Sequence, residues 1–158
     1  MILGIHHAAI STPDLDRALA FYCDLLGFTV ASRMDWPRGT ALPDTILGVR
    51  DTAARQAKLR AGNCFLEIFE FSSPPPRSHD RAIQDHGITH LCLHVRDLEA
   101  EVARLQAAGI TFRSDPQLRP THASVYGHDP DGNVLELLEV MDDSHPFSFT
   151  TLSRKDQA

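Results

Sequence analysis

The feature that most constrains the fold of this chain is an internal repeat. Residues 4–15 align with residues 87–98, and Gly, Ile, His, Asp and Leu recur at the same places in the two segments. Self-similarity at a fixed spacing is the signature of a duplicated structural unit. The repeat therefore predicts that the chain contains two copies of one unit.

The similarity continues beyond these segments. In each copy, apolar residues then recur at helical spacing, with an Asp at the start (Asp14, Asp97) and a Gly at the end (Gly27, Gly109). Asp favours the first turn of a helix, and Gly favours the position just after the last turn. Residues typical of strands follow both glycines, at 28–30 and 110–112. Each copy is thus predicted to run strand, helix, strand.

The two copies also end alike, with Leu-Glu-Ile around Glu67 and Leu-Glu-Leu around Glu136. The sequence predicts an α+β chain made of two tandem βαβββ modules. The separation from His7 to Glu67 is longer than that from His90 to Glu136, 60 residues against 46, so the first copy carries about 14 extra residues. They are expected within 36–55, which is rich in Pro, Gly and Thr, and long insertions of this kind often form lids or binding loops.

The expected organisation is one domain over residues 1–141, made of module 1 (1–72) and module 2 (85–141). Residues 72–79 contain three consecutive prolines and are predicted to be a stiff linker. Residues 142–158 show no periodicity and are interpreted as a C-terminal tail.

Composition limits the possible functions. Of 158 residues, 42% are hydrophobic and 23% are charged, the mixture of a globular protein, and no apolar run reaches the length of a membrane span. The net charge of −6, without a Lys/Arg cluster, predicts no nucleic-acid or membrane partner. The N-terminus has no pattern of a secretion signal, so the expected location is cytoplasmic. The three widely spaced cysteines are interpreted as reduced, buried, small hydrophobic residues.

The repeat places one histidine (His7, His90) at the same point of each first strand and one glutamate (Glu67, Glu136) at the same point of each last strand. If the two modules pair about a pseudo-twofold axis, these four side chains converge on one point. Imidazole and carboxylate groups are ligands of Zn, Ni, Co, Mn and Fe. We therefore expect one divalent metal ion at this point, with positions open for water or substrate.

Each of these residues also has a simpler interpretation, because a lone strand histidine or glutamate is usually a structural or solvated residue. Repeat equivalence favours His7 over His6, since His6 aligns with a threonine. Glu70 and Glu139 lie three residues beyond the candidate ligands, so they should face the other side and be solvated. His94 is left open as a substrate contact or an ordinary residue. Residues 129–133 are predicted to form a tight turn.

These residues resemble those of the vicinal oxygen chelate superfamily. The similarity rests on the first His strand ending in Asp-Leu, on Phe-Tyr and Leu-Gly-Phe at 21–28, on the second Gly-x-x-His strand, and on Asp-Pro-Asp-Gly-Asn-x-x-Glu at 129–136. The resemblance covers about residues 1–140 and implies paired βαβββ modules that form a U-shaped sheet around a metal site, commonly in a homodimer. Members include glyoxalase I, methylmalonyl-CoA epimerase, extradiol dioxygenases, fosfomycin-inactivating transferases and metal-free drug-binding proteins.

The ligand set implies a reaction class. Glyoxalase I has His, Glu, His and Glu at positions that correspond to His7, Glu67, His90 and Glu136, whereas the epimerase has Gln in place of the first Glu. The complete set favours an isomerase, epimerase or lyase that abstracts a proton next to a metal-bound carbonyl of a small-molecule substrate. Glu67 and Glu136 are the candidate catalytic bases. The placement of the insertion is closer to the epimerase group, so the substrate stays open.

Two alternatives remain. A ferrous extradiol-type dioxygenase requires only His7, His90 and Glu136, and a metal-free binding protein requires none of the ligands. In any of these, the insertion is expected to line the substrate pocket with apolar and cationic side chains. The candidates are Met34, Trp36, Pro37, Leu42, Arg33, Arg38 and Arg50.

Overall fold

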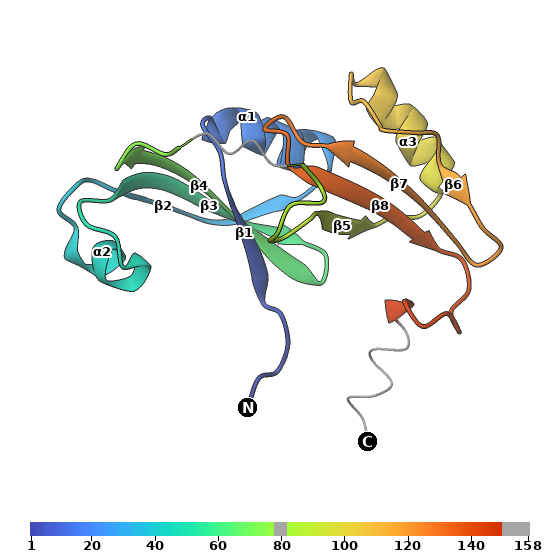
Figure 1. The fold of residues 1–158 in the computed structure, drawn as a ribbon, viewed down its shortest axis with the longest axis horizontal. Coiled ribbons are helices and arrows are strands. Elements are labelled where there is room, and N and C mark those ends of the chain that lie inside the picture. The colour runs from blue at the N-terminus through green and yellow to red at the C-terminus, as the bar shows by residue number, and fades with distance from the viewer. Residues whose placement is uncertain (78–81, 150–158) are drawn as a thin grey trace. The chain divides into compact units, whose positions relative to one another are not determined.

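The computed structural model describes residues 1–77 and 82–149. The chain forms two compact units, residues 1–80 and residues 81–158, and each is described by itself. Each unit contains a four-stranded mixed sheet and a helix that packs on it (Figure 1). The α+β class and the two tandem βαβββ modules predicted from the repeat are thus confirmed. In the described part of the chain, no helix combines the length and the apolar character that a membrane crossing requires.

The first unit is built around a sheet with the strand order β1-β4-β3-β2. The strands are β1 (His7–Ser11), β2 (Thr29–Trp36), β3 (Ala53–Ala61) and β4 (Cys64–Ser73). β1 pairs with β4 in parallel, and the other pairs are antiparallel. The first and last strands of the module are therefore neighbours, which brings residues far apart in the sequence side by side.

The helix of this unit begins as the sequence predicts. Asp14 is the N-cap of α1 (Leu15–Leu19), and its carboxylate accepts a hydrogen bond from the Arg17 backbone N–H at 3.0 Å. The helix continues as the wider turn η1 (Ala20–Leu25), and Gly27, with φ of 77°, ends it. Its buried side chains pack on the buried residues of the sheet. The core members are Leu15, Ala18, Leu19, Phe21 and Tyr22 from the helix, and Ala57, Leu59, Leu66 and Ile68 from the sheet.

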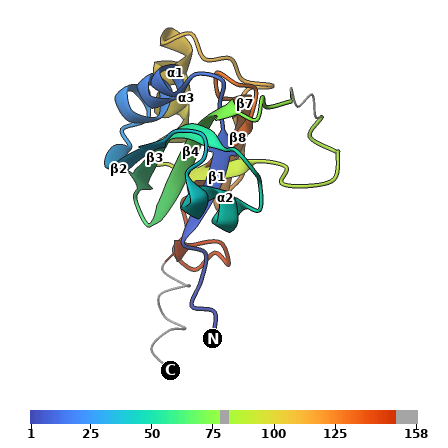
Figure 2. The same ribbon diagram turned by 90° about the vertical axis from the view of Figure 1, so that its left-hand side faces the viewer.

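The insertion lies between β2 and β3, as expected, and it contains a helix, α2 (Ala41–Leu47). Asp44 closes the segment, because its carboxylate accepts hydrogen bonds from the backbone N–H groups of Asp51 and Thr52, both at 2.8 Å. The Trp36 indole donates to the Thr52 hydroxyl at 3.0 Å and is buried. Figures 1 and 2 place α1 and α2 on opposite sides of the first sheet.

The second unit repeats this plan with the strand order β5-β8-β7-β6. The strands are β5 (Leu91–His94), β6 (Gln117–Leu118), β7 (His122–His128) and β8 (Val134–Val140), and the helix is α3 (Leu98–Ala107). Asp97 caps α3 through the Ala100 backbone N–H, and Gly109 follows its end with φ of 89°. The core joins α3 to β7 and β8 through Leu98, Val102, Leu105, Ala123, Val125, Leu135 and Leu137.

The predicted strand at 110–112 is wrong in its position. Phe112 makes only an isolated bridge to Gly127, and the strand β6 starts at Gln117. A Cβ atom added to Gly127 would lie 3.0 Å from the Phe112 ring, so glycine allows the close approach at this point. The turn predicted at 129–133 is present, because the buried Asp129 carboxylate accepts from the backbone N–H groups of Asp131 and Asn133.

The expectation that Glu70 and Glu139 are simply solvated is wrong. Glu70 accepts a hydrogen bond from the Leu15 backbone N–H at 3.2 Å and pairs with Arg55 at 3.0 Å. Glu139 accepts from the backbone N–H groups of Asp97 at 2.7 Å and Leu98 at 2.9 Å. These two equivalent glutamates lie on the helix side of their sheets and bind the unsatisfied N–H groups at the start of α1 and α3.

The proposed tail begins with turns, and the ring of Phe149 packs against His94 with a centroid distance of 5.0 Å. Residues 74–77 have no regular structure. The remainder of the predicted linker, 78–79, and of the predicted tail, 150–158, lies outside the described residues.

Candidate functional site

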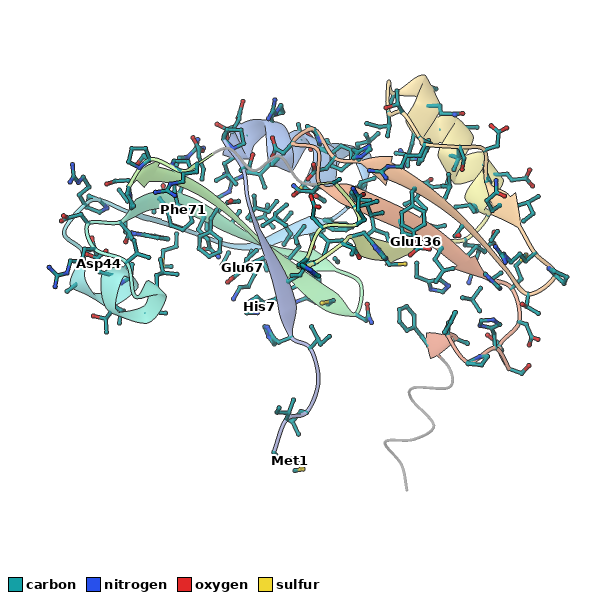
Figure 3. All side chains as sticks on the ribbon, in the orientation of Figure 1. Met1, His7, Asp44, Glu67, Phe71 and Glu136 are labelled. Carbon is teal, nitrogen blue, oxygen red and sulfur yellow. The ribbon has the colours of Figure 1, made fainter. Side chains whose placement is uncertain are left out.

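One face of the first sheet carries the predicted site residues. Glu67 on β4 lies beside Ala9, the residue two positions after His7 on β1, so strand alternation puts both site side chains on the same face. The neighbouring residues Leu66 and Ile68 are buried and point the other way, toward α1. The distance from His7 Nε2 to Glu67 Oε2 is 3.2 Å. Figure 3 shows these two side chains on the adjoining strands β1 and β4. We call this pair the first half-site.

Two further side chains from β3 reach Glu67. Lys58 Nζ lies 2.8 Å from Glu67 Oε1, and Gln56 Nε2 donates to the same oxygen at 3.2 Å. The sheet register places Lys58 directly opposite Glu67. Neither residue was predicted from the sequence. Strand alternation could have put Lys58 and Gln56 on one face of β3, but the sequence alone did not give the register that aligns this face with Glu67.

His6 and His7 have different roles. The Nδ1 atoms of the two rings lie 2.9 Å apart, within hydrogen-bond distance, and the His6 ring stacks on Phe65. This contact leaves Nε2 of His7 directed at Glu67. His6 thus orients the ring of His7, in the way that a hydrogen-bonded neighbour fixes the ring of a metal-binding histidine.

The second unit repeats the arrangement. His90 immediately precedes β5, and its Nε2 lies 3.1 Å from Glu136 Oε2 on β8. The Thr89 hydroxyl lies 2.8 Å from His90 Nδ1, so Thr89 takes the place that His6 has in the first unit. This pair, the second half-site, is half-buried on the face of the sheet opposite α3. In both units, Nε2 of the histidine therefore faces the glutamate carboxylate.

The neighbours of Glu136 are neutral groups. Burial, the charge of Glu136 and a hydrogen bond to its carboxylate together raise the pKa of the Cys92 thiol to about 12. The same three causes, in the same order, raise the pKa of Tyr126, whose ring also packs edge-on against His90. The expectation of three buried cysteines is wrong, because Cys23 and Cys64 are only partly buried and Cys92 is exposed as a residue, although its thiol lies against Glu136 and is partly shielded from solvent. Cys92 and Tyr126 were not predicted as site residues.

The donor set of each half-site fits a metal ion. Two atoms bound to one ion at about 2.0–2.2 Å, with ordinary tetrahedral or octahedral angles, lie roughly 3.0–3.5 Å apart. The His–Glu separations of 3.2 and 3.1 Å match this spacing. Each unit by itself supplies two donors, and among residues 1–77 and 82–149 no group of three or more His, Cys, Asp or Glu side chains is gathered for a metal. The assembly of all four ligands around one ion stays a prediction.

The insertion lines a hollow apart from the first half-site. An open cavity of about 300 Å³ is bordered by Trp36 and Pro37, but His7 and Glu67 are not among its lining residues. Trp36 does not present a free apolar surface, because it packs edge-on against Phe69 and Phe71. Met34 and Leu42 are exposed, and Arg38 forms a long ion pair with Asp51 at 3.9 Å.

Comparison with known proteins identifies relatives over nearly the whole chain. The family model of the Glyoxalase/Bleomycin resistance protein/Dioxygenase superfamily matches residues 4–137. The uncharacterized protein YaeR of Escherichia coli is 34% identical over 139 residues, which cover 85% of this chain and 95% of the relative. A 2-epi-5-epi-valiolone epimerase of an Actinomyces species is 34% identical over 146 residues, which cover 87% and 80%.

A solved structure gives the same result for the fold. The glyoxalase family protein APC24694 from Bacillus cereus superposes with a TM-score of 0.80, at 19% identity, over 90% of this chain and 97% of that one. Its likeness extends over both modules. The pattern of residues and the fold therefore agree on one family.

Proposed function

Because the chain belongs to the Glyoxalase/Bleomycin resistance protein/Dioxygenase superfamily, we propose that it is a metal-dependent isomerase, epimerase or lyase. It removes a proton from a carbon next to a carbonyl of a small-molecule substrate. The observation that carries this proposal is the pair of equivalent half-sites, each with an imidazole nitrogen and a carboxylate oxygen 3.1–3.2 Å apart. A glutamate at both carboxylate positions supports proton transfer, since one can bind while the other accepts a proton.

His7, Glu67, His90 and Glu136 would hold one divalent ion. When bound, a divalent metal polarises a substrate carbonyl and stabilises the negative charge that forms when the adjacent C–H loses its proton. The residues of the chain provide the other functions. His6 and Thr89 orient the two imidazoles, and the glutamates are the groups that can accept a proton and return it.

The substrate is proposed only as a class. The relative named as an epimerase supports a compound with a stereocentre next to a carbonyl group. We also propose that the single domain covers residues 1–141 and that the protein works as a homodimer. Sedimentation of the purified chain tests the second point.

The experiment is solvent exchange. The metal-loaded protein is incubated in D₂O with α-hydroxyketones and 2-substituted acyl thioesters, and the loss of the proton next to the carbonyl is followed by NMR. We expect Glu67→Gln to keep metal but to lose nearly all exchange. A fully active Glu67→Gln variant would remove Glu67 from the mechanism, and no exchange with any wild-type sample would contradict the proposed reaction class.

One observation favours a second candidate, an extradiol-type dioxygenase. Glu67 is already engaged by Lys58 and Gln56, and without it the remaining ligands are two histidines and one glutamate, the set that non-haem ferrous oxygenases use. Oxygen uptake with catechols, dependent on Fe²⁺, distinguishes the two functions. Uptake without proton exchange supports the dioxygenase, and exchange without uptake supports the isomerase.

A further inference from the structure

The two half-sites differ in the charge that surrounds their carboxylates. In the first half-site, Glu67 Oε1 lies 2.8 Å from the ammonium group of Lys58 and 3.2 Å from the amide of Gln56. Both side chains are mostly buried, with 28% of Lys58 and 14% of Glu67 exposed, so solvent screens this pair less than a surface ion pair. One oxygen of Glu67 is thus occupied by cationic and amide donors, and the other faces His7.

Among the described residues of the second unit, two neutral groups interact with the Glu136 carboxylate in addition to its histidine. These are the Tyr126 hydroxyl and the Cys92 thiol. Within the described residues of this unit, no ion pair joins Glu136 to a Lys or Arg side chain. The negative charge of Glu136 is therefore available to a cation, whereas that of Glu67 is largely compensated by Lys58.

This difference has a direct electrostatic consequence. An ion bound by Glu67 would lie within roughly 6 Å of the Lys58 ammonium, and at that distance a unit positive charge lowers the affinity for a divalent ion about tenfold even in a water-like dielectric. The lysine also holds Glu67 in place when the carboxylate is not bound to the metal. The two effects together favour a ligand that can leave the metal without losing its position.

We propose that Lys58, assisted by Gln56, is a positioning residue that makes Glu67 the more weakly held, exchangeable carboxylate ligand of the metal. Glu136 is the permanent carboxylate ligand. This inference rests on the proposed function, because it concerns the same metal site. It adds the residue that makes the two carboxylate ligands unequal.

The test measures the affinity for Zn²⁺ by competition with a chelator, on the full chain and without substrate. Lys58→Met removes the charge and keeps most of the side-chain stem, and Lys58→Arg restores the charge. Arg60→Met is the matched control, since Arg60 is two residues along the same strand, on the same face, and lies over the Phe65 ring rather than beside Glu67. Lys58→Gln is a second neutral variant, and far-UV circular dichroism checks the folding of each.

We expect Lys58→Met and Lys58→Gln to bind Zn²⁺ about tenfold more tightly than the wild type, with Lys58→Arg and Arg60→Met within about threefold of it. We also expect Glu136→Gln to weaken Zn²⁺ binding more than Glu67→Gln does. Unchanged or weaker binding by both neutral Lys58 variants, or an equal gain in Arg60→Met, would overturn the inference while leaving the metal site intact. A wild-type protein that binds no Zn²⁺ would instead overturn the proposed function, and this inference with it.

Discussion

Glu139 tests which face of the second sheet each glutamate of β8 occupies. The structure places Glu139 on the face that α3 covers and Glu136 on the opposite face, beside His90. Its carboxylate accepts from the backbone N–H groups of Asp97 and Leu98, at 2.7 and 2.9 Å, and Leu98 is only 1% exposed. Glu139→Ala leaves a buried N–H at the start of α3 without its acceptor, a loss of about 1–3 kcal/mol. The removed negative charge at the helix N-terminus adds about 0.3–1 kcal/mol.

We therefore expect Glu139→Ala to lower the free energy of unfolding by about 1–4 kcal/mol, which for a chain of this size corresponds to a fall in Tm of about 3–15 °C. The assay is urea unfolding followed by far-UV circular dichroism, because the single tryptophan, Trp36, reports only on the first unit. Glu99→Ala is the control, since Glu99 is an exposed acidic residue in the first turn of the same helix. Equal effects of the two substitutions would refute the capping role of Glu139.

Two further predictions concern titratable groups. Hydrogen bonds from the Thr52 side chain, and then from the backbone N–H groups of Thr52 and Asp51, hold the pKa of the Asp44 carboxyl below its ordinary 3.8. The hydrogen bonds by which Asp44 closes the insertion should therefore be intact above pH 3.8 and be lost as the pH falls below the lowered pKa. The Trp36 indole donates to Thr52, so the fluorescence of Trp36 should change with pH only below 3.8. The substitution Asp44→Asn should change this fluorescence at neutral pH, and a spectrum identical to that of the wild type would contradict the closing role of Asp44. For Cys92, a pKa of about 12 predicts alkylation at pH 8 about 1000-fold slower than that of a thiol at the ordinary 9.0. In the metal-free protein, Glu136→Gln should increase the rate of Cys92 alkylation but not restore that of an ordinary thiol, because burial contributes more than Glu136 to the raised pKa of Cys92. If peptide mapping shows no increase in Cys92 alkylation, Glu136 does not influence this thiol.

Much of the fold followed from the sequence because the repeat and the capping residues are local signals. Asp14 and Asp97 cap the helices as predicted, and the glycines that follow them end the helices. Strand alternation, together with the equivalence of the two copies, was enough to pair His7 with Glu67 and His90 with Glu136 on the same faces.

What the sequence did not predict depends on pairing between distant segments. Lys58 lies opposite Glu67 because of the register between β3 and β4, which the sequence pattern does not determine. Glu70 and Glu139 were interpreted as solvated because their role requires the start of a helix to lie over the end of a strand. No strand forms at 110–112, where Phe112 makes an isolated bridge to Gly127 and packs its ring against that glycine.

In the proposed site, a histidine and a glutamate from each unit bind a single metal ion. Its most direct test is the metal content of the purified and reconstituted protein by elemental analysis, beside His7→Ala from the first unit, Glu136→Ala from the second, and Glu99→Ala as the control. We expect about one equivalent of divalent metal in the wild type and the control, and a loss of metal in both site variants. No metal after reconstitution, two equivalents per chain, or unchanged content in either site variant would contradict it.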